Sequence, residues 1–191
     1  MRKLIAAMKI SVDGKYEGAQ GYADWVHGWS DDYGVTPQID ACVLGGRMYD
    51  GYEAYWTAIG DHPGKPLPQT GAAPTPGELE WVEFARRTPH YVVSATKRTA
   101  AWPNTRFLRG LDDVAALKAR PGKDIYLMGG ATLTGAALDA GLVDEIRLIV
   151  YPLIAGNGPF LFATTSIRHP LALRKFEQWP DGRLSYVYDI G

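Results

Sequence analysis

Two segments of this 191-residue chain share one pattern: a short apolar strand, a Gly-Gly pair and a predicted helix. The pairs are Gly45-Gly46 and Gly129-Gly130. Glycine lets a ligand approach the backbone closely, and the free N–H groups and positive dipole end of the following helix attract phosphate. Arg47 adds a cation at the first helix start. Two such sites in one small domain predict a dinucleotide ligand; the alternative is that these glycines only make tight turns.

A basic segment could extend this dinucleotide site. Ser94, Thr96, Lys97 and Arg98 follow a predicted strand at 91–95. Hydroxyls and two cations at the end of a strand could hold a phosphomonoester such as the 2′-phosphate of NADP. The alternative is a solvated basic turn. The sequence lacks G-x-G-x-x-G, G-x-x-x-x-G-K-[ST] and G-x-S-x-G, which weighs against a conventional dehydrogenase, a P-loop NTPase and an α/β hydrolase.

The carboxylate candidates beyond the end of the first strand are Asp13, Asp31 and Asp32. A carboxylate there could orient a heterocycle and supply a proton during hydride transfer to a C=N bond. The alternatives are that Asp13 only forms a turn and that the Asp31-Asp32 pair only stabilises a helix N-terminus. Aromatic side chains could stack on a flat ring or simply pack in the core. They are Trp25, Trp29, Tyr49, Tyr52 and Tyr55, and the substrate-binding candidates are Trp25, Tyr49, Tyr52 and Tyr151.

The elements that must position these residues alternate between strand and helix. Residues 4–12 read as a central strand, with Leu4, Ala6 and Met8 on one face and Ala7 and Lys9 on the other. Further strands are predicted at 41–44, 91–95, 125–128 and 146–151, and helices at 47–58, 78–87, 112–119 (Asp112 as N-cap) and 132–140 (Gly141 as C-cap). A turn at 179–182 joins strands 171–179 and 183–190 into a hairpin. The order predicts one α/β domain over 1–191 with a mixed sheet, and a Pro/Gly-rich surface excursion at 60–77.

Composition narrows the class of partner. Lys plus Arg number 20 and Asp plus Glu number 21, giving a net charge of −1, which argues against a nucleic-acid partner and against electrostatic membrane attachment. The chain has one cysteine, Cys42, which lies in a predicted buried strand. Its four histidines are far apart, so no metal site is expected. With no signal peptide or membrane span expected, the sequence predicts a cytoplasmic protein.

Several of these segments closely resemble the C-terminal reductase domain of bifunctional riboflavin-biosynthesis proteins and the stand-alone dihydrofolate reductase-like proteins of bacteria. The matching stretches run in the same order over nearly the whole chain. They are 11–15, 40–49, 102–105, 129–133, 138–148 and 151–158. The zinc deaminase signature of the bifunctional proteins is missing. The folate-site carboxylate of true dihydrofolate reductases has no unambiguous counterpart, because Ser30 stands beside Asp31 and Asp32.

The resemblance implies a dihydrofolate reductase-like fold, a three-layer α/β/α arrangement with a mixed, mostly parallel sheet and a C-terminal antiparallel hairpin, which binds NADPH and commonly pairs as a homodimer. Ala7 would face the nicotinamide, and a cis Gly129-Gly130 peptide is expected. Phosphates and the adenosine 2′-phosphate would be held by Gly45, Gly46, Arg47, Met48, Ser94, Lys97, Arg98, Gly129, Gly130, Ala131, Thr132 and Leu133.

The resulting hypothesis is an NADPH-dependent reductase that transfers a hydride to a C=N or C=O carbon of a small heterocycle, such as a ribosylaminopyrimidine or a pterin. The alternatives are a reductase of unrelated carbonyl or nitro compounds, a non-catalytic nucleotide-binding module, and a dimeric structural protein. An enzyme requires open space beside the nicotinamide, lined by Asp13, Asp32 or Tyr49. In a pure binder Trp25 or Trp29 could fill that space. In a structural protein the two Gly-Gly pairs would line no cavity.

Overall fold

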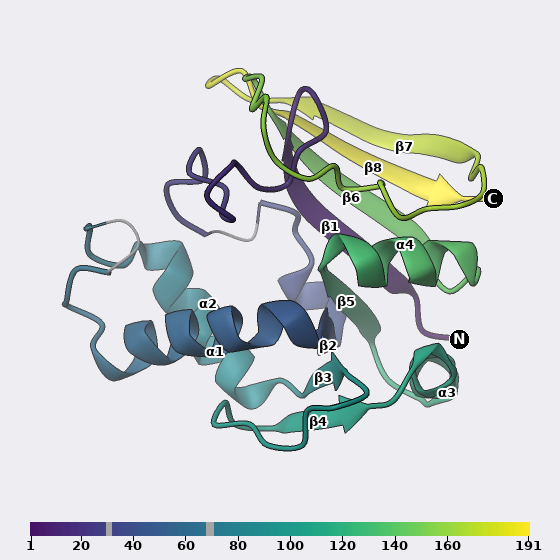
Figure 1. Ribbon diagram of the computed structural model, residues 1–191, viewed down its shortest axis with the longest axis horizontal. Coiled ribbons are helices and arrows are strands. Elements are labelled where there is room, and N and C mark those ends of the chain that lie inside the picture. Colours follow the sequence, from purple (N-terminus) through teal and green to yellow (C-terminus); the bar gives the residue numbers. More distant parts are fainter. Residues whose placement is uncertain (30–31, 68–70) are drawn as a thin grey trace.

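A computed structural model describes residues 1–29, 32–67 and 71–191. Its centre is an eight-stranded sheet with the order β4-β3-β2-β5-β1-β6-β8-β7 (Figure 1). The first six of these strands run parallel, β8 runs antiparallel to β6, and β7 runs antiparallel to β8. The strands are β1 (Leu4–Ser11), β2 (Ile39–Gly45), β3 (His90–Val93), β4 (Thr105–Leu108), β5 (Asp124–Gly129), β6 (Glu145–Tyr151), β7 (Leu171–Gln178) and β8 (Leu184–Ile190).

The central strands are buried on both faces, and the period of two in their sequences decides which core each side chain joins. Ile5 and Ala7 of β1 pack in one core with Trp56 and Trp81 from two helices. Leu4 and its face pack in a second core with side chains of two other helices. Helices therefore cover both faces of the sheet and make a three-layer α/β/α arrangement, as the resemblance implied.

The helices are α1 (Gly46–Asp61), α2 (Pro76–Arg87), α3 (Leu111–Ala119) and α4 (Ala131–Asp139), with a short 3₁₀ turn, η1 (Thr36–Gln38). α1 and α2 contribute to the first core, and α3 and α4 to the second. α2 begins at Pro76 because Thr75 and Glu78 form a reciprocal capping box. Among the described residues, no helix has both the length and the apolar character needed to cross a membrane.

Two local features differ from those predicted. Asp112 is not the N-cap of α3: the helix begins one residue earlier, at Leu111, with Gly110 as the N-cap. Asp112 lies in the first turn, where its charge still favours the helix dipole. β4 was not predicted, because its four residues are too short to show a clear alternation.

Candidate functional site

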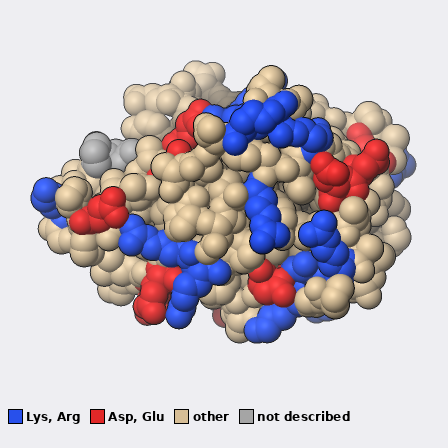
Figure 2. Space-filling model, turned by 90° about the horizontal axis from the view of Figure 1, so that it is seen from below, with Lys and Arg blue, Asp and Glu red and all other residues tan. Residues whose placement is uncertain are grey.

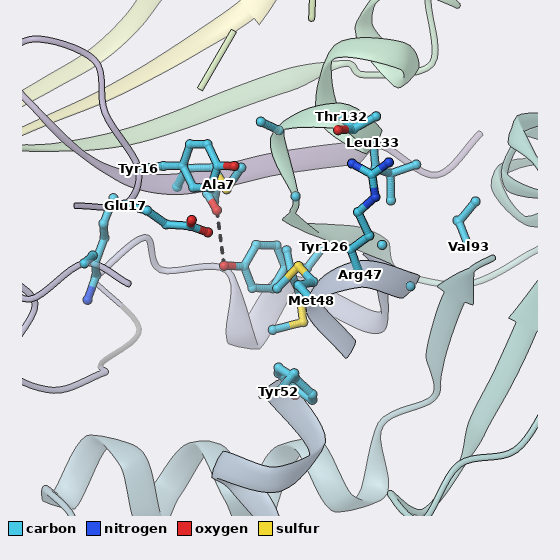
Figure 3. Close-up of a pocket in the computed structure, with 18 of the residues that line it drawn as sticks. Ala7, Tyr16, Glu17, Arg47, Met48, Tyr52, Val93, Tyr126, Thr132 and Leu133 are labelled. Carbon is cyan, nitrogen blue, oxygen red and sulfur yellow. Dashed lines mark hydrogen bonds between the residues drawn. The ribbon is translucent and has the colours of Figure 1, made fainter. Parts of the chain in front are cut away.

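A cavity of about 770 Å³ opens at the carboxyl ends of the parallel strands, within the range of small-molecule sites. Ligands of open α/β sheets bind at this edge, because loops and helix N-termini converge there. The structure brings together at this cavity many of the residues predicted from sequence (Figure 3). They are Ala7, Gly45, Gly46, Arg47, Met48, Tyr52, Gly130, Ala131, Thr132 and Leu133. Gly129 immediately precedes this group but is not itself in the lining.

The first Gly-Gly pair joins β2 to α1. Gly45 is the N-cap of the helix in an extended conformation (φ −80°, ψ 144°), and no side chain caps the first-turn N–H groups. The first turn also holds no acidic residue. Arg47 instead places a cation at the positive end of the helix dipole and lines the cavity. This arrangement is unfavourable alone and becomes favourable when an anion binds there.

The second pair joins β5 to α4. Gly129 and Gly130 both have positive φ, 112° and 85°. The first turn of α4 again holds no acidic residue, and no side chain caps it. The expected cis Gly129-Gly130 bond is wrong: none of the described peptide bonds is cis. Two glycines at positive φ already reverse the chain between strand and helix, so a trans peptide completes the turn.

The other helix ends show that open N-termini are not general in this chain. Thr75 and Glu78 cap α2 completely, and Asp112 and Asp113 supply negative charge to the first turn of α3. Only α1 and α4, among the four described α-helices, lack both a side-chain cap and a first-turn acid. Both of these open N-termini contribute residues to the same cavity. The site therefore offers two sets of backbone donors and one arginine to an anionic ligand.

The predicted 2′-phosphate segment lies just beyond Val93, which lines the cavity, but its own side chains have other partners. Ser94 Oγ accepts hydrogen bonds from the backbone N–H groups of Thr96 and Lys97. Lys97 forms an ion pair with Asp50, and exposed Arg98 donates to the Lys97 carbonyl oxygen. Basic and acidic side chains also alternate over the face seen in Figure 2. A phosphate in this segment would have to replace Asp50 as the partner of Lys97.

The predicted catalytic carboxylates do not gather at the cavity. Asp13 accepts from Ser11 and from the backbone of Ala155 and Gly156, and these bonds lower its pKa to about 2. It fixes the turn after β1 and is not in the cavity lining. Asp32 lies behind the wall, 3.0 Å from Lys9 Nζ and 3.1 Å from Arg183 Nη1. Asp31 lies outside the described residues.

The substrate-binding candidates also separate. Tyr52 lines the cavity. Tyr49 lies on the buried face of α1, and its hydroxyl donates to Glu53 of the same helix at 2.6 Å. Trp25 lines a second hollow of about 470 Å³, and Tyr151 is packed against Arg183. Cys42 is fully buried and burial raises the pKa of its thiol, so it acts as a small apolar side chain, as predicted.

Several lining residues were not identified from the sequence. Lys9 and Glu17 bring charge to the wall, and Tyr33, Trp56 and Tyr126 bring rings. Trp29, one of the aromatic candidates from the sequence, also lines the cavity. A signal for Lys9 was present: it is a lysine on the face of a central strand that is otherwise buried. Glu17 had no such signal because it lies in a loop, and only the fold directs its carboxylate toward the cavity (Figure 3).

This chain belongs to the RibD C-terminal domain family, whose model matches residues 2–184. It is 31% identical to the uncharacterized protein YyaP of Bacillus subtilis over 194 residues, covering 98% of this chain and 94% of that protein. The family is the one that the sequence resemblance indicated.

Solved structures support the fold. A putative riboflavin biosynthesis protein from Shewanella sp. PV-4 superposes with a TM-score of 0.70 at 18% identity, covering 99% of both chains. A dihydrofolate reductase from Enterococcus faecalis, complexed with NADP(H), gives a TM-score of 0.60 at 12% identity, covering 99% of this chain and 96% of that one. The predicted dihydrofolate reductase-like fold with its C-terminal antiparallel hairpin is confirmed.

Proposed function

We propose that this protein is an NADPH-dependent reductase of the cytoplasm, which transfers a hydride to a C=N or C=O carbon of a small heterocycle. One observation carries the proposal: two uncapped helix N-termini and Arg47 converge on one cavity. That donor set fits the linked phosphates of a dinucleotide. Family membership and the NADP(H) complex of the Enterococcus faecalis neighbour support the same cofactor. A ribosylaminopyrimidine or a pterin is the substrate class implied by the resemblance.

The chain's own residues would bind and align the two reactants. The N–H groups at Gly45–Met48 and Gly130–Leu133 would hold phosphates, with Arg47 as their counter-charge. Ser94, Lys97 and Arg98 would take the 2′-phosphate. Tyr52, Trp29 and Trp56 would exclude water from the reacting carbon. NADPH supplies the hydride when bound, and the protein contributes alignment and electrostatics.

Glu17 is the proton donor in this proposal. Its carboxylate lines the cavity, and burial raises its pKa above the usual range. Among the described residues it forms no ion pair that would hold it ionised. A raised pKa keeps a carboxyl protonated to higher pH, which suits a general acid. Asp32, the sequence-based candidate, is instead a neighbour of Lys9 and Arg183 behind the wall.

Calorimetric titration of the purified protein with NADPH and, separately, with NADH tests the cofactor. We expect micromolar binding of NADPH and much weaker binding of NADH. The double variant Lys97→Ala/Arg98→Ala should weaken NADPH far more than NADH; equal weakening would remove the 2′-phosphate assignment. Absence of binding for either nucleotide would leave the glycine turns as purely structural features and end the reductase proposal.

The alternatives make different demands on the cavity. A structural protein would have Gly-Gly pairs that line no cavity, whereas Gly45, Gly46 and Gly130 line this one. A pure binder would have the substrate space filled by Trp25 or Trp29. Trp25 lies in the second hollow, and Trp29 forms part of the wall of an open cavity. Oxidation of bound NADPH on addition of a carbonyl or nitro compound would separate the remaining alternatives.

We also propose that the protein is a homodimer that associates through the β7–β8 hairpin. All eight residues of β7 are exposed, at the edge of the sheet. Leu171, Leu173 and Phe176 pair in register with Ile190, Tyr188 and Tyr186, which gives one apolar face. Leu173 and Phe176 remain 56% and 52% exposed. Analytical ultracentrifugation should show a dimer that Leu173→Glu with Phe176→Glu converts to a monomer; a wild-type monomer would refute the proposal.

A further inference from the structure

The segment that the proposed function assigns to the 2′-phosphate, residues 94–98, lies along one side of α1. Gly46 and Asp50 are four residues apart in this helix, so they share one of its faces. Gly46 meets the start of the segment, since a Cβ there would lie 2.8 Å from Ser94 Cβ. Asp50, one helical turn further on, forms the ion pair with Lys97. The helix that offers its N-terminus to the cavity therefore also places a carboxylate beside the 2′-phosphate segment.

Hydrogen bonds fix the backbone on both sides of Lys97. Ser94 Oγ accepts from the Lys97 backbone N–H at 3.1 Å. The Arg109 guanidinium donates to the carbonyl oxygens of Ser94 and Lys97 at 3.0 and 3.2 Å. Further along the chain, Glu53 of α1 accepts from the Trp102 backbone N–H at 2.7 Å. The turn that presents Lys97 is therefore formed without a ligand.

Three cations gather at this turn, and they differ in their partners. Arg98 and Arg109 both donate to the Lys97 carbonyl oxygen. Lys97 instead pairs with the carboxylate of Asp50. A phosphomonoester carries up to about two negative charges, and it repels a carboxylate that holds the same ammonium. A phosphate that binds here must displace Asp50 from Lys97 or bear that repulsion.

We infer that Asp50 is a specificity-determining residue, whose carboxylate competes with the 2′-phosphate for Lys97 and so limits the preference for NADPH over NADH. The inference rests on the proposed function for the cofactor and for the place of its 2′-phosphate. NADH carries a hydroxyl in place of this phosphate and requires no cation there. The ion pair between Asp50 and Lys97 can persist when NADH binds, so Asp50 weakens the binding of the phosphorylated cofactor alone.

The exposure of the ion pair sets the size of the effect. The Asp50 side chain is 72% exposed and the Lys97 side chain is 27% exposed. Ion pairs in contact with water are weak and are screened by salt. Removing the Asp50 charge should therefore tighten NADPH binding about threefold to fivefold. This gain should shrink as the salt concentration rises.

Calorimetric titration of wild type and Asp50→Asn with NADPH and with NADH tests the inference. We expect Asp50→Asn to bind NADPH about threefold to fivefold more tightly and to change NADH affinity by less than about twofold. Unchanged NADPH affinity overturns the inference. Equal gains for both cofactors also overturn it, because they would show only the effect of a lower net negative charge.

Two further variants separate the ion pair from other causes. Asp61→Asn is the matched control, because it removes an exposed carboxylate from the same helix, paired with Arg86 at 2.7 Å. It should change neither affinity, and a gain equal to that of Asp50→Asn overturns the inference. Asp50→Glu keeps the charge and should keep the wild-type preference. A gain in Asp50→Glu as large as that in Asp50→Asn shows that the carboxylate is not the cause.

Adenosine fragments remove the nicotinamide from the test. 2′,5′-ADP and 5′-AMP share the adenosine 5′-phosphate and differ in the 2′-phosphate. Asp50→Asn should tighten 2′,5′-ADP by the same factor as NADPH and leave 5′-AMP unchanged. A difference between wild type and Asp50→Asn that persists undiminished at high salt contradicts an electrostatic competition.

The same titrations keep the two proposals separate. NADPH binding that Asp50→Asn leaves unchanged rejects this inference alone. A gain for 2′,5′-ADP in a protein that binds neither NADPH nor NADH supports the competition at Lys97 and rejects the reductase proposal. Absence of binding for both cofactors and both fragments, in wild type and in Asp50→Asn, rejects the two proposals together.

Discussion

The two Gly-Gly turns have the same sequence pattern and different structural reasons for their glycines. In the turn from β2 to α1, Gly45 has an ordinary extended φ of −80°, and Gly46 is needed for space, since a Cβ there would lie 2.8 Å from Ser94 Cβ. In the turn from β5 to α4, both glycines adopt positive φ, 112° and 85°. Glycine in the β2–α1 turn therefore allows close packing and close approach of a ligand. Glycine in the β5–α4 turn allows a backbone conformation that other residues rarely adopt.

This difference separates stability from binding. A side chain at the second turn must adopt a conformation that L-residues rarely occupy, so substitution there is costly to the fold. A side chain at Gly45 meets only ordinary contacts, 3.8 Å to Leu133 Cβ and 3.9 Å to the Gly129 oxygen. The added side chain would, however, lie at the wall of the cavity, because Gly45 lines it. The same substitution should therefore damage folding at one turn and ligand binding at the other.

The largest effect is expected for Gly129→Ala. Its φ of 112° is unsuited to alanine, and the added Cβ would also meet the Met8 sulfur. We expect a loss of about 3 kcal/mol in the free energy of unfolding, measured by urea denaturation. Met8→Ala/Gly129→Ala separates the causes, because removing the Met8 side chain relieves the contact and not the backbone strain. A Gly129→Ala protein as stable as the wild type would contradict the assigned conformation.

A second prediction concerns the loss of stability at low pH that follows from a buried histidine on β3, the strand beside the first turn. His90 of β3 pairs in register with Cys42 of β2, accepts from the Tyr52 hydroxyl and contacts the Thr88 carbonyl. Burial lowers its pKa from 6.5 to about 4. Between these values the unfolded chain binds a proton that the folded chain does not, so stability rises with pH across this window. The expected loss on acidification is about 1.4 kcal/mol per pH unit at most.

Urea denaturation between pH 7 and pH 5 measures this effect. His90→Gln should remove the slope in that range, whereas exposed His27→Gln should retain it. At the C-terminal end of α4, the helix that follows the second turn, hydrogen bonds from Ser166 and His169 hold the pKa of Asp139 well below its usual range. The stability that ionised Asp139 contributes therefore persists until the pH falls through its lowered pKa. Equal slopes in wild type and His90→Gln would show that His90 titrates normally.

A smaller effect is expected for Arg47→Ala. Loss of its charge-assisted contact should raise the Kd for NADPH about tenfold, near 1.4 kcal/mol. Stability should be unchanged or slightly higher, because a cation leaves the positive end of α1. Calorimetry measures the affinity and urea denaturation the stability. Arg120→Ala, exposed at the end of α3, is the control. Unchanged NADPH affinity in Arg47→Ala would remove the first turn from the proposed phosphate site.

A small change in stability, together with weaker binding, is expected for Gly45→Ala. The residue has an ordinary φ and open surroundings, so the free energy of unfolding should change by no more than about 0.5 kcal/mol. NADPH affinity should nevertheless fall, because the new methyl group lies at the cavity. Parallel measurements of unfolding and binding check both statements. A large loss of stability with intact binding would reverse the assignment of the two turns.

Local patterns predicted the scaffold of the site more successfully than its chemistry. The two turns, the central strand and the C-terminal hairpin lie where the sequence places them, with boundaries shifted by one to three residues. The carboxylates show the opposite result. Asp13 and Asp32 both follow β1 in the chain, but one stabilises a turn and the other lies behind the wall. Position along the chain does not fix the direction of a side chain in a loop.

The sequence by itself determined the strand–helix order, the two glycine turns and the family, because alternation, glycine and capping act through neighbouring residues. Tertiary structure decided which side chains meet in the cavity. Lys9 of β1, Trp56 of α1 and Thr132 of α4 line one space although they lie far apart in the chain. The sheet order places β5 between β1 and β2, and that order follows from non-local packing of two cores. The cavity therefore exists only in the folded molecule.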